Sequence, residues 1–247
     1  MRQRNTELQE RAGSQMRSLG IDEAFGFSGA ATPTLKRKLD VKRMVDVAGA
    51  VLFGIALAPI WIGASAALWL SGQKEILFQQ ERAGLHGKPF TMYKFRTMAW
   101  DGDMPPALFE RVRQDFIAEL EGRASADPVS GLYKQHSEQV TRLGSFLRKY
   151  SIDEIPQLLN VFRGEMSLVG PRPAIVWEAE CFSVRQQRRH SVKPGITGLW
   201  QVSGRNLMTT AEMIELDLNY VEKQSIWRDL MILLRTPGAV LLRKATR

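Results

Sequence analysis

The sequence predicts an α+β fold, a mainly helical domain with a small β-hairpin and one N-terminal, proline-kinked membrane helix. Three observations predict it. Residues 47–70 carry no charge, residues 75–98 have strand-like segments around glycines, and several later segments place apolar residues at helical spacing. A chain of 247 residues is long enough for one moderate domain with appendages.

The chain divides into three regions by composition. Residues 1–34 are polar, contain Gly and Ser and show no sustained apolar period, so we expect a disordered leader. Residues 35–72 combine a basic flank with the apolar segment, which starts too late for a secretory signal. Residues 73–247 form the main domain, which we expect to end in an amphipathic segment from Trp227 to Arg247.

The apolar stretch Val47–Leu70 has three interpretations. A straight helix of this length would reach about 36 Å, more than the roughly 30 Å hydrocarbon core, which favours a single span. Pro59 would bend it into two arms of about 18 Å each, which favours a re-entrant hairpin. A buried core helix is less favoured, because 24 uncharged residues exceed most soluble helices. The basic flank before Val47 places the N-terminal end in the cytoplasm.

The net charge of +8 predicts anionic partners, namely nucleic acid, anionic lipid or phosphorylated small molecules. No helix-turn-helix, aromatic RNA-binding strand or zinc knuckle is present, and much of the basic excess flanks apolar segments, so we expect no nucleic acid. Cys181 is the only cysteine, which excludes an internal disulfide, and the three histidines lack zinc-like spacing.

Secondary structure after the membrane segment begins with strands at Glu75–Gln80 and Pro89–Met98, joined by a turn. Alternation in the second strand places Lys94 and Arg96 on one face. Residues 99–138 are predicted to form a helix and loop insertion. Leu143, Phe146, Leu147 and Tyr150 then follow helical spacing, and a further helix is predicted at 209–224.

Adjacent carboxylates occur at Asp153 and Glu154, in the run Ser151–Leu158. Ser151 and Glu154 fit a capping box, but a helix capped by Ser151 would place Pro156 where it deletes a backbone hydrogen bond. A helix that starts near Asp153 puts Pro156 in the first turn, at little cost. Neighbours on a helix are about 100° apart, so the two acids would not share a proton. Carboxylates at a helix start are suited to act as a nucleophile or a metal ligand. Acidic residues are also common in the first turn of a helix without any catalytic role, because they stabilise the helix dipole.

Cationic side chains that could contact phosphate are Lys94, Arg96 and Arg172, the last held between two prolines. Taken singly, each is more typical of a solvated surface charge. Arg205, in a glycine-punctuated loop, and Asp217, on the helix predicted at 209–224, are further candidates for substrate binding. Asp217 fits packing at the edge of the core equally well.

Six motifs in order resemble the bacterial sugar transferases, the monotopic polyprenyl-phosphate phosphoglycosyltransferases that start polysaccharide assembly. The resemblance covers residues 42–236, and its motifs occupy residues 78–84, 93–98, 142–144, 151–158, 166–173 and 193–198. It implies the short form of the family, a catalytic domain with one apolar hairpin. Residues 199–202 are similar to the branch that acts on UDP-glucose or UDP-galactose. Family hairpins often carry Ser before the helix-breaking proline, whereas this chain has Ala58.

The resemblance implies a covalent transfer of hexose-1-phosphate from a UDP-sugar to undecaprenyl phosphate, with release of UMP. Asp153 would be the nucleophile and a ligand of Mg²⁺, with Glu154 beside it. Lys94, Arg96 and Arg172 would bind the substrate phosphates. The product would start exopolysaccharide, capsule or O-antigen assembly.

The resemblance also implies a place in the cell, the bacterial inner membrane with the catalytic domain on the cytoplasmic face, where UDP-sugars are found. This favours the hairpin over the single span, and an oligomer is compatible with the sequence. The alternative function is a catalytically inactive, membrane-tethered scaffold or regulator of the same fold. The intact Asp153, Glu154 and Arg172 argue against it.

Overall fold

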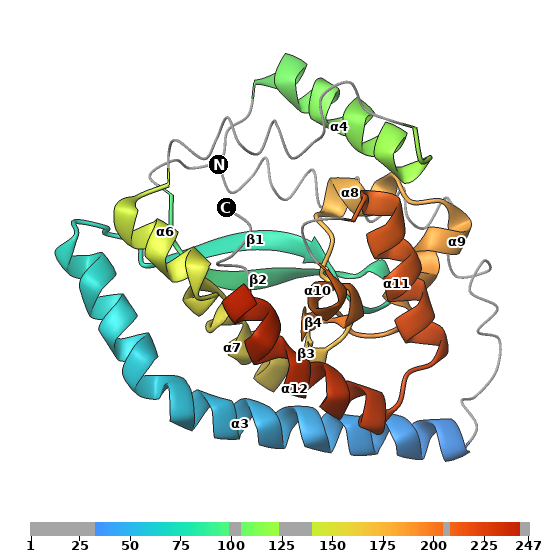
Figure 1. Ribbon diagram of the computed structural model, residues 1–247, viewed down its shortest axis with the longest axis horizontal. Helices are drawn as coiled ribbons and strands as arrows, with labels where there is room; N and C mark the ends of the chain where they lie inside the picture. The colour runs from blue at the N-terminus through green and yellow to red at the C-terminus, as the bar shows by residue number, and fades with distance from the viewer. Residues whose placement is uncertain (1–32, 99–104, 124–139, 205–207, 243–247) are drawn as a thin grey trace. The chain divides into compact units, whose positions relative to one another are not determined.

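The computed structural model describes residues 33–98, 105–123, 140–204 and 208–242 (Figure 1). Most of the predicted leader therefore lies outside the described residues. The description below concerns the unit Val41–Arg247. This unit is mainly helical with a small antiparallel sheet, as predicted.

The apolar segment lies within helix α3, Pro33–Leu70, which continues through Pro59 (Figure 1). Figure 1 shows that α3 bends along its length, as expected where a proline removes a hydrogen bond from a helix. Among the described residues, Val41–Leu70 is a stretch long and apolar enough to cross a membrane by length and composition. Large apolar side chains such as Met44, Leu52 and Ile62 are exposed on it. The return of both ends to one side of a membrane stays a prediction.

The predicted hairpin is confirmed as β1, Leu77–Ala83, paired antiparallel with β2, Pro89–Phe95. Both strands differ in extent from the prediction, since β1 continues to Ala83 and β2 stops before Arg96. A second sheet pairs β3, Ser167–Val169, in parallel with β4, Gly195–Thr197. This parallel pairing brings together segments that are far apart in the sequence.

Eight further α-helices are described, and the predicted helices before Asp153 and at 209–224 are confirmed among them. Thr141 caps the first of these, accepting a hydrogen bond from the Gly144 backbone N–H at 2.9 Å, and Thr209 caps the second through a capping box with Glu212. The helices are α4 (Pro106–Leu120), α6 (Arg142–Lys149), α7 (Gln157–Arg163), α8 (Val176–Glu180), α9 (Val184–Gln187), α10 (Leu199–Ser203), α11 (Thr210–Glu222) and α12 (Ile226–Leu242).

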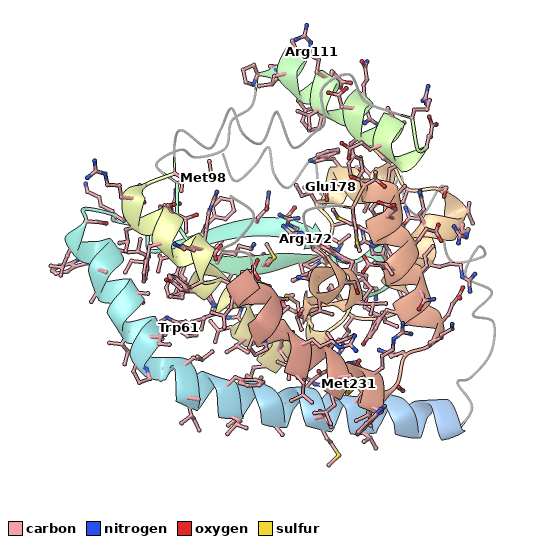
Figure 2. All side chains as sticks on the ribbon, viewed as in Figure 1. Trp61, Met98, Arg111, Arg172, Glu178 and Met231 are labelled. Atoms are coloured by element: carbon pink, nitrogen blue, oxygen red, sulfur yellow. The ribbon has the colours of Figure 1, made fainter. Side chains whose placement is uncertain are left out.

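Three buried apolar clusters form the core of the described residues, and two of them are larger than the third. One joins β2, α7, β3, α11 and α12 through Met92, Val161, Val169, Tyr220 and Ile232. The other joins α4, α8 and α11 through apolar residues that include Phe116, Ala179 and Leu218. Trp61 of α3, labelled in Figure 2, packs edge-on against Phe95 of β2 with ring centroids 6.1 Å apart.

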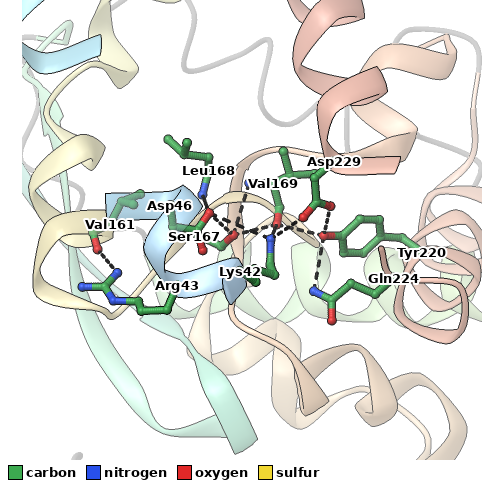
Figure 3. Close-up of polar contacts among 10 residues, drawn as sticks. All are labelled: Lys42, Arg43, Asp46, Val161, Ser167, Leu168, Val169, Tyr220, Gln224 and Asp229. Carbon is green, nitrogen blue, oxygen red and sulfur yellow. Dashed lines mark hydrogen bonds and ion pairs between the residues drawn. The ribbon is translucent and has the colours of Figure 1, made fainter. Parts of the chain in front are cut away.

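A polar network fixes α3 to this domain (Figure 3). Lys42 Nζ donates to Asp229 Oδ2 of α12 at 2.7 Å and to the Val169 carbonyl at 3.2 Å. Asp46 accepts from the Ser167 hydroxyl and the Leu168 backbone N–H, and the Tyr220 hydroxyl donates to Asp229 Oδ1 at 2.6 Å. Buried charges on the apolar helix are therefore paired or hydrogen-bonded, which reduces the cost of removing them from water.

Candidate active site

The acidic pair lies on a 3₁₀ turn, Ile152–Glu154, between α6 and α7. Ser151 precedes it in the left-handed region with φ 55° and makes no side-chain capping bond, so the capping-box interpretation is wrong. Pro156 is the N-cap of α7, where its missing N–H costs little. Among the described residues, only His86 and Ser151 are non-glycine residues with positive φ. Such strain occurs preferentially at functional sites.

The two carboxylates have different surroundings. Asp153 is 9% exposed, and Glu154 is partly buried with its Oε1 atom 3.2 Å from Lys94 Nζ of β2. Burial lowers the pKa of Lys94, and Arg172 and Arg82 lower it further, whereas Glu154 and Asp153 oppose the shift. The positive charges of Lys94, Arg172 and Arg82 therefore interact electrostatically with the carboxylates of Glu154 and Asp153.

An open cleft lies at the acidic turn, with Glu154 in its lining. Its walls come from β1, β2, the 3₁₀ turn, α7, the loop after β3, β4 and α10. The lining residues are Arg82, Met92, Lys94, Glu154, Gln157, Arg172, Pro173, Gly195, Ile196 and Gln201. The cationic groups of Arg82, Lys94 and Arg172 make this cleft suitable for a phosphorylated ligand.

Arg172 is positioned by a rigid loop that packs against the segment around β4. Gly170 N–H donates to the Thr197 carbonyl at 2.9 Å, and Gly195 N–H donates to the Pro171 carbonyl at 2.8 Å. A Cβ atom on Gly195 would lie 2.1 Å from Gly170 N, so only glycine permits this approach. Figure 2 shows Arg172 near one end of the β1–β2 sheet.

Buried charges support the Arg172 loop from behind. Arg189 donates to the Arg172 carbonyl at 2.8 Å and to Asp217 Oδ2 at 2.5 Å, and Arg82 donates to the Pro173 carbonyl at 3.1 Å. Asp217 is 1% exposed, and burial raises its pKa to about 6 against the opposing effect of Arg189. The backbone that carries Arg172 is thus tied to a buried ion pair.

The predicted site residues divide into three groups. Lys94, Glu154 and Arg172 line one cleft, and Asp153 lies next to Glu154 on the same turn. Arg96 pairs with Glu75 at 2.5 Å, and Asp217 pairs with Arg189 behind the Arg172 loop; neither is among the described residues that line the cleft. Arg205 lies outside the described residues.

Arg82, Gln157 and Gln201 also line the cleft, although the sequence did not predict them as site residues. Arg82 could have been found by strand alternation, because Arg82 pairs with Phe90 two residues before Met92, and even-numbered residues of both strands share a face. Gln157 directly follows the proline of the acidic turn. Gln201 carries no local signal, since only the β3–β4 pairing brings its segment to the cleft.

Asp153 and Glu154 are the carboxylates at the cleft that could bind Mg²⁺. Within the described ranges there is no group of three or more His, Cys, Asp or Glu side chains that could hold a metal ion. Mg²⁺ is commonly bound by one or two carboxylates together with substrate phosphates. Asp153, next to a cleft lined by Arg82, Lys94 and Arg172, fits that second pattern.

The sequence of the chain is similar to those of known proteins. The family model described as bacterial sugar transferase matches residues 37–243. An uncharacterized sugar transferase, EpsL of Bacillus subtilis, is 39% identical over 202 residues, covering 82% of this chain and 88% of its own length.

Two further relatives have more specific names. The galactosyl transferase CpsE of Streptococcus agalactiae is 40% identical over 239 residues, 91% of this chain and 49% of CpsE. The chain thus spans about half the length of CpsE. The UDP-glucose:undecaprenyl-phosphate glucose-1-phosphate transferase of Caulobacter vibrioides is 38% identical over 208 residues, 81% of this chain and 69% of that protein.

Proposed function

Because the chain belongs to the bacterial sugar transferase family, we propose that it transfers hexose-1-phosphate from a UDP-sugar to undecaprenyl phosphate. Glucose or galactose is the proposed hexose, in keeping with the names of the Caulobacter and Streptococcus relatives. The observation that carries the proposal is the cationic cleft beside the strained turn of Asp153 and Glu154. We assign the product to exopolysaccharide, capsule or O-antigen assembly.

The proposed reaction has two displacements at phosphorus. The Asp153 carboxylate attacks the β-phosphorus of the UDP-sugar, an O–P bond forms, and the bond to UMP breaks so that UMP leaves. An oxygen of undecaprenyl phosphate then attacks the same phosphorus. The Asp153–phosphorus bond breaks, which regenerates the carboxylate and yields undecaprenyl diphosphate hexose.

The neighbouring side chains have separate proposed roles. Lys94, Arg172 and Arg82 bind the phosphate oxygens and balance their charge, which reduces repulsion of the attacking Asp153. Glu154 accepts a hydrogen bond from Lys94, so it orients that cation, and through Lys94 it helps to orient the incoming lipid phosphate. Asp153, together with the substrate phosphates, would hold Mg²⁺, which supplies further charge neutralisation when bound.

The membrane arrangement belongs to the same proposal. UDP-sugars are cytoplasmic and Lys36 to Arg43 are basic, so α3 enters the inner membrane from the cytoplasm and returns at its Pro59 bend. The exposed apolar residues of α3 support contact with lipid. The catalytic domain then faces the cytoplasm, next to the phosphate of the lipid acceptor.

The test is an assay of UMP release with purified protein in detergent, magnesium, UDP-glucose or UDP-galactose, and undecaprenyl phosphate. We expect Asp153→Asn to lower UMP release by about 10³-fold or more, because an amide is a poor nucleophile toward phosphorus. Without the lipid acceptor, hexose-labelled substrate should label the parent chain covalently and leave Asp153→Asn unlabelled.

The matched control is Glu110→Gln, which removes an exposed carboxylate on α4. It should retain parental activity. Equal UMP release by the parent and Asp153→Asn would refute the proposed nucleophile. No UMP release from any UDP-hexose by the parent would instead indicate the inactive scaffold.

A further inference from the structure

Gln201 brings a buried hydrogen-bond acceptor to the cleft. The residue is 3% exposed and lines the cleft with Lys94 and Arg172. In the part of the chain that the structure describes, Gln201 Oε1 has no hydrogen-bond partner. Buried polar atoms of folded proteins are nearly always hydrogen-bonded, so an unpaired one in a residue that lines a cleft indicates a partner that the ligand supplies.

The orientation of the Gln201 amide is fixed by its other end. Nε2 donates a hydrogen bond to the Ile196 carbonyl of β4 at 3.1 Å. Exchanging the two amide atoms would place Oε1 against that carbonyl, so two acceptors would face each other. Oε1 is therefore the atom that stays available for a donor.

The backbone near Gln201 shows why this acceptor is well placed. Gly198 precedes α10, and a Cβ atom on it would lie 2.9 Å from Gln201 Oε1 and 2.4 Å from the Gly170 carbonyl. Because Gly198 has no side chain, the Gly170 carbonyl and the Gln201 amide can both lie close to this backbone, and the segment packs on the loop that carries Arg172. The two packed segments bring both Arg172 and Gln201 into the lining of the cleft.

We propose that Gln201 Oε1 accepts a hydrogen bond from an N–H or O–H group of the nucleotide sugar, and so helps to select that substrate. The inference rests on the proposed function, because the ligand of the cleft is taken to be a UDP-hexose. Its neutral donors are the uracil imide N–H and the hydroxyls of the ribose and the hexose. The phosphate of undecaprenyl phosphate is mainly an acceptor near neutral pH, so the lipid does not supply this bond.

The test compares the parent with Gln201→Met, which keeps the length of the side chain and removes the acceptor. Both chains are assayed with UDP-glucose, with its N3-methyluracil analogue and with analogues that lack single hydroxyls of the ribose or the hexose. With UDP-glucose, we expect Gln201→Met to raise KM about tenfold with a smaller effect on kcat. With the analogue that lacks the relevant donor, the two chains should become equal, because the bond is already lost.

The analogue that abolishes the difference identifies the source of the donor. Equality on the N3-methyl analogue assigns the uracil, and equality on one deoxyribose or deoxyhexose analogue assigns the hydroxyl that it lacks. The same fold loss on every substrate would overturn the inference, since a purely structural defect affects all of them alike. Ser203→Ala, which removes an exposed hydroxyl from the same helix, is the control and should match the parent.

Two further measurements keep this inference separate from the proposed reaction. Kd for UDP-glucose, measured by calorimetry on Asp153→Asn with and without Gln201→Met, reports binding without turnover. Weaker binding with the same analogue pattern supports the inference even if no transfer occurs. Should Gln201→Met fail to fold, a parent chain that uses all analogues equally well overturns it.

Discussion

Lys94 lies at the centre of the charge distribution in the cleft. Its ammonium group is 3.2 Å from Glu154, and Arg82 and Arg172 line the same cleft. Burial lowers its pKa, so the cationic form is held at a cost that Glu154 and Asp153 partly offset. A substrate diphosphate would add negative charge next to Lys94 and favour the cationic form further.

Replacing Lys94 with Met should therefore lower kcat/KM for UDP-hexose by about 10²-fold, because one phosphate contact is lost and Glu154 is left without this cation. UMP-release kinetics measure the effect. Lys88→Met, which removes an exposed lysine at the turn of the same hairpin, is the control. Equal kinetics for Lys94→Met and Lys88→Met would contradict the role of Lys94.

His190 predicts acid sensitivity of the fold. Burial and the adjacent Arg189 lower its pKa to about 3, from 6.5. Between these values the unfolded chain binds a proton that the folded chain does not, so stability falls as pH falls. The loss at pH 4 should be about 3 kcal/mol. Asp217 has the opposite effect on stability. Because its pKa is raised in the folded chain, its contribution to stability increases as pH falls.

The measurement is the free energy of unfolding of the parent and of His190→Gln at several pH values. The difference between them isolates His190, because Asp217 contributes to both chains. The parent should lose stability relative to the variant below pH 6.5. Parallel pH curves for the two chains would rule out a buried neutral histidine.

Helix α3 is apolar over most of its length, but it is attached to the rest of the domain by buried polar contacts. Lys42 lies one turn before Asp46, and both point to the domain, where Lys42 pairs with Asp229 and Asp46 accepts a hydrogen bond from Ser167 (Figure 3). The Tyr220 hydroxyl donates to Asp229. Burial and the neighbouring Asp229 raise the pKa of Tyr220, so its hydroxyl remains a donor. The sequence indicated basic residues near the membrane, but it did not indicate that Lys42 is a packing residue.

Lys42→Met should lower the free energy of unfolding by about 3–5 kcal/mol, because Asp229 and Asp46 stay buried without this cation. Thermal unfolding in detergent measures the loss. Lys223→Met removes an exposed lysine at the end of α11 and should change little. A melting temperature of Lys42→Met equal to that of the Lys223 variant would show that the network contributes no stability.

The molecule exposes apolar side chains on two elements that the Lys42–Asp229 contact connects. They lie along α3, and on α12 they include Trp227, Leu230 and Leu234. On α12, Asp229 and Ile232 face the interior instead, so apolar residues occur on both sides of this helix. Contact of the C-terminal segment Trp227–Arg247 with lipid stays a prediction, and its last residues, 243–247, lie outside the described part.

Topology can be tested by labelling single cysteines in a Cys181→Ser background. Thr32→Cys and Lys74→Cys flank the membrane segment, and a hairpin through the Pro59 bend places both on the cytoplasmic face. A membrane-impermeant thiol reagent added to sealed inverted vesicles should label both variants. Labelling of Lys74→Cys but not Thr32→Cys would establish a spanning helix instead.

Local sequence patterns predicted much of the fold and part of the candidate site. Alternation predicted the hairpin, and the position of Pro156 predicted that Ser151 is not a cap, because both depend on neighbours within a few residues. Arg96 shows the limit of such reasoning. Its alternation places it with Lys94, but β2 ends at Phe95, and the side chain pairs with Glu75.

The sequence by itself determined the apolar helix, the hairpin, the turn that carries the acidic pair and, through its ordered motifs, the family. Tertiary structure alone decided which cations meet at Glu154, since Arg82, Lys94 and Arg172 come from three separate segments. The tertiary structure also decided that Asp217 pairs with Arg189 behind the Arg172 loop and that Gln201 lines the cleft. The physical reason is that helical period, alternation and proline geometry act between near neighbours, whereas a cleft is formed by contacts across the chain.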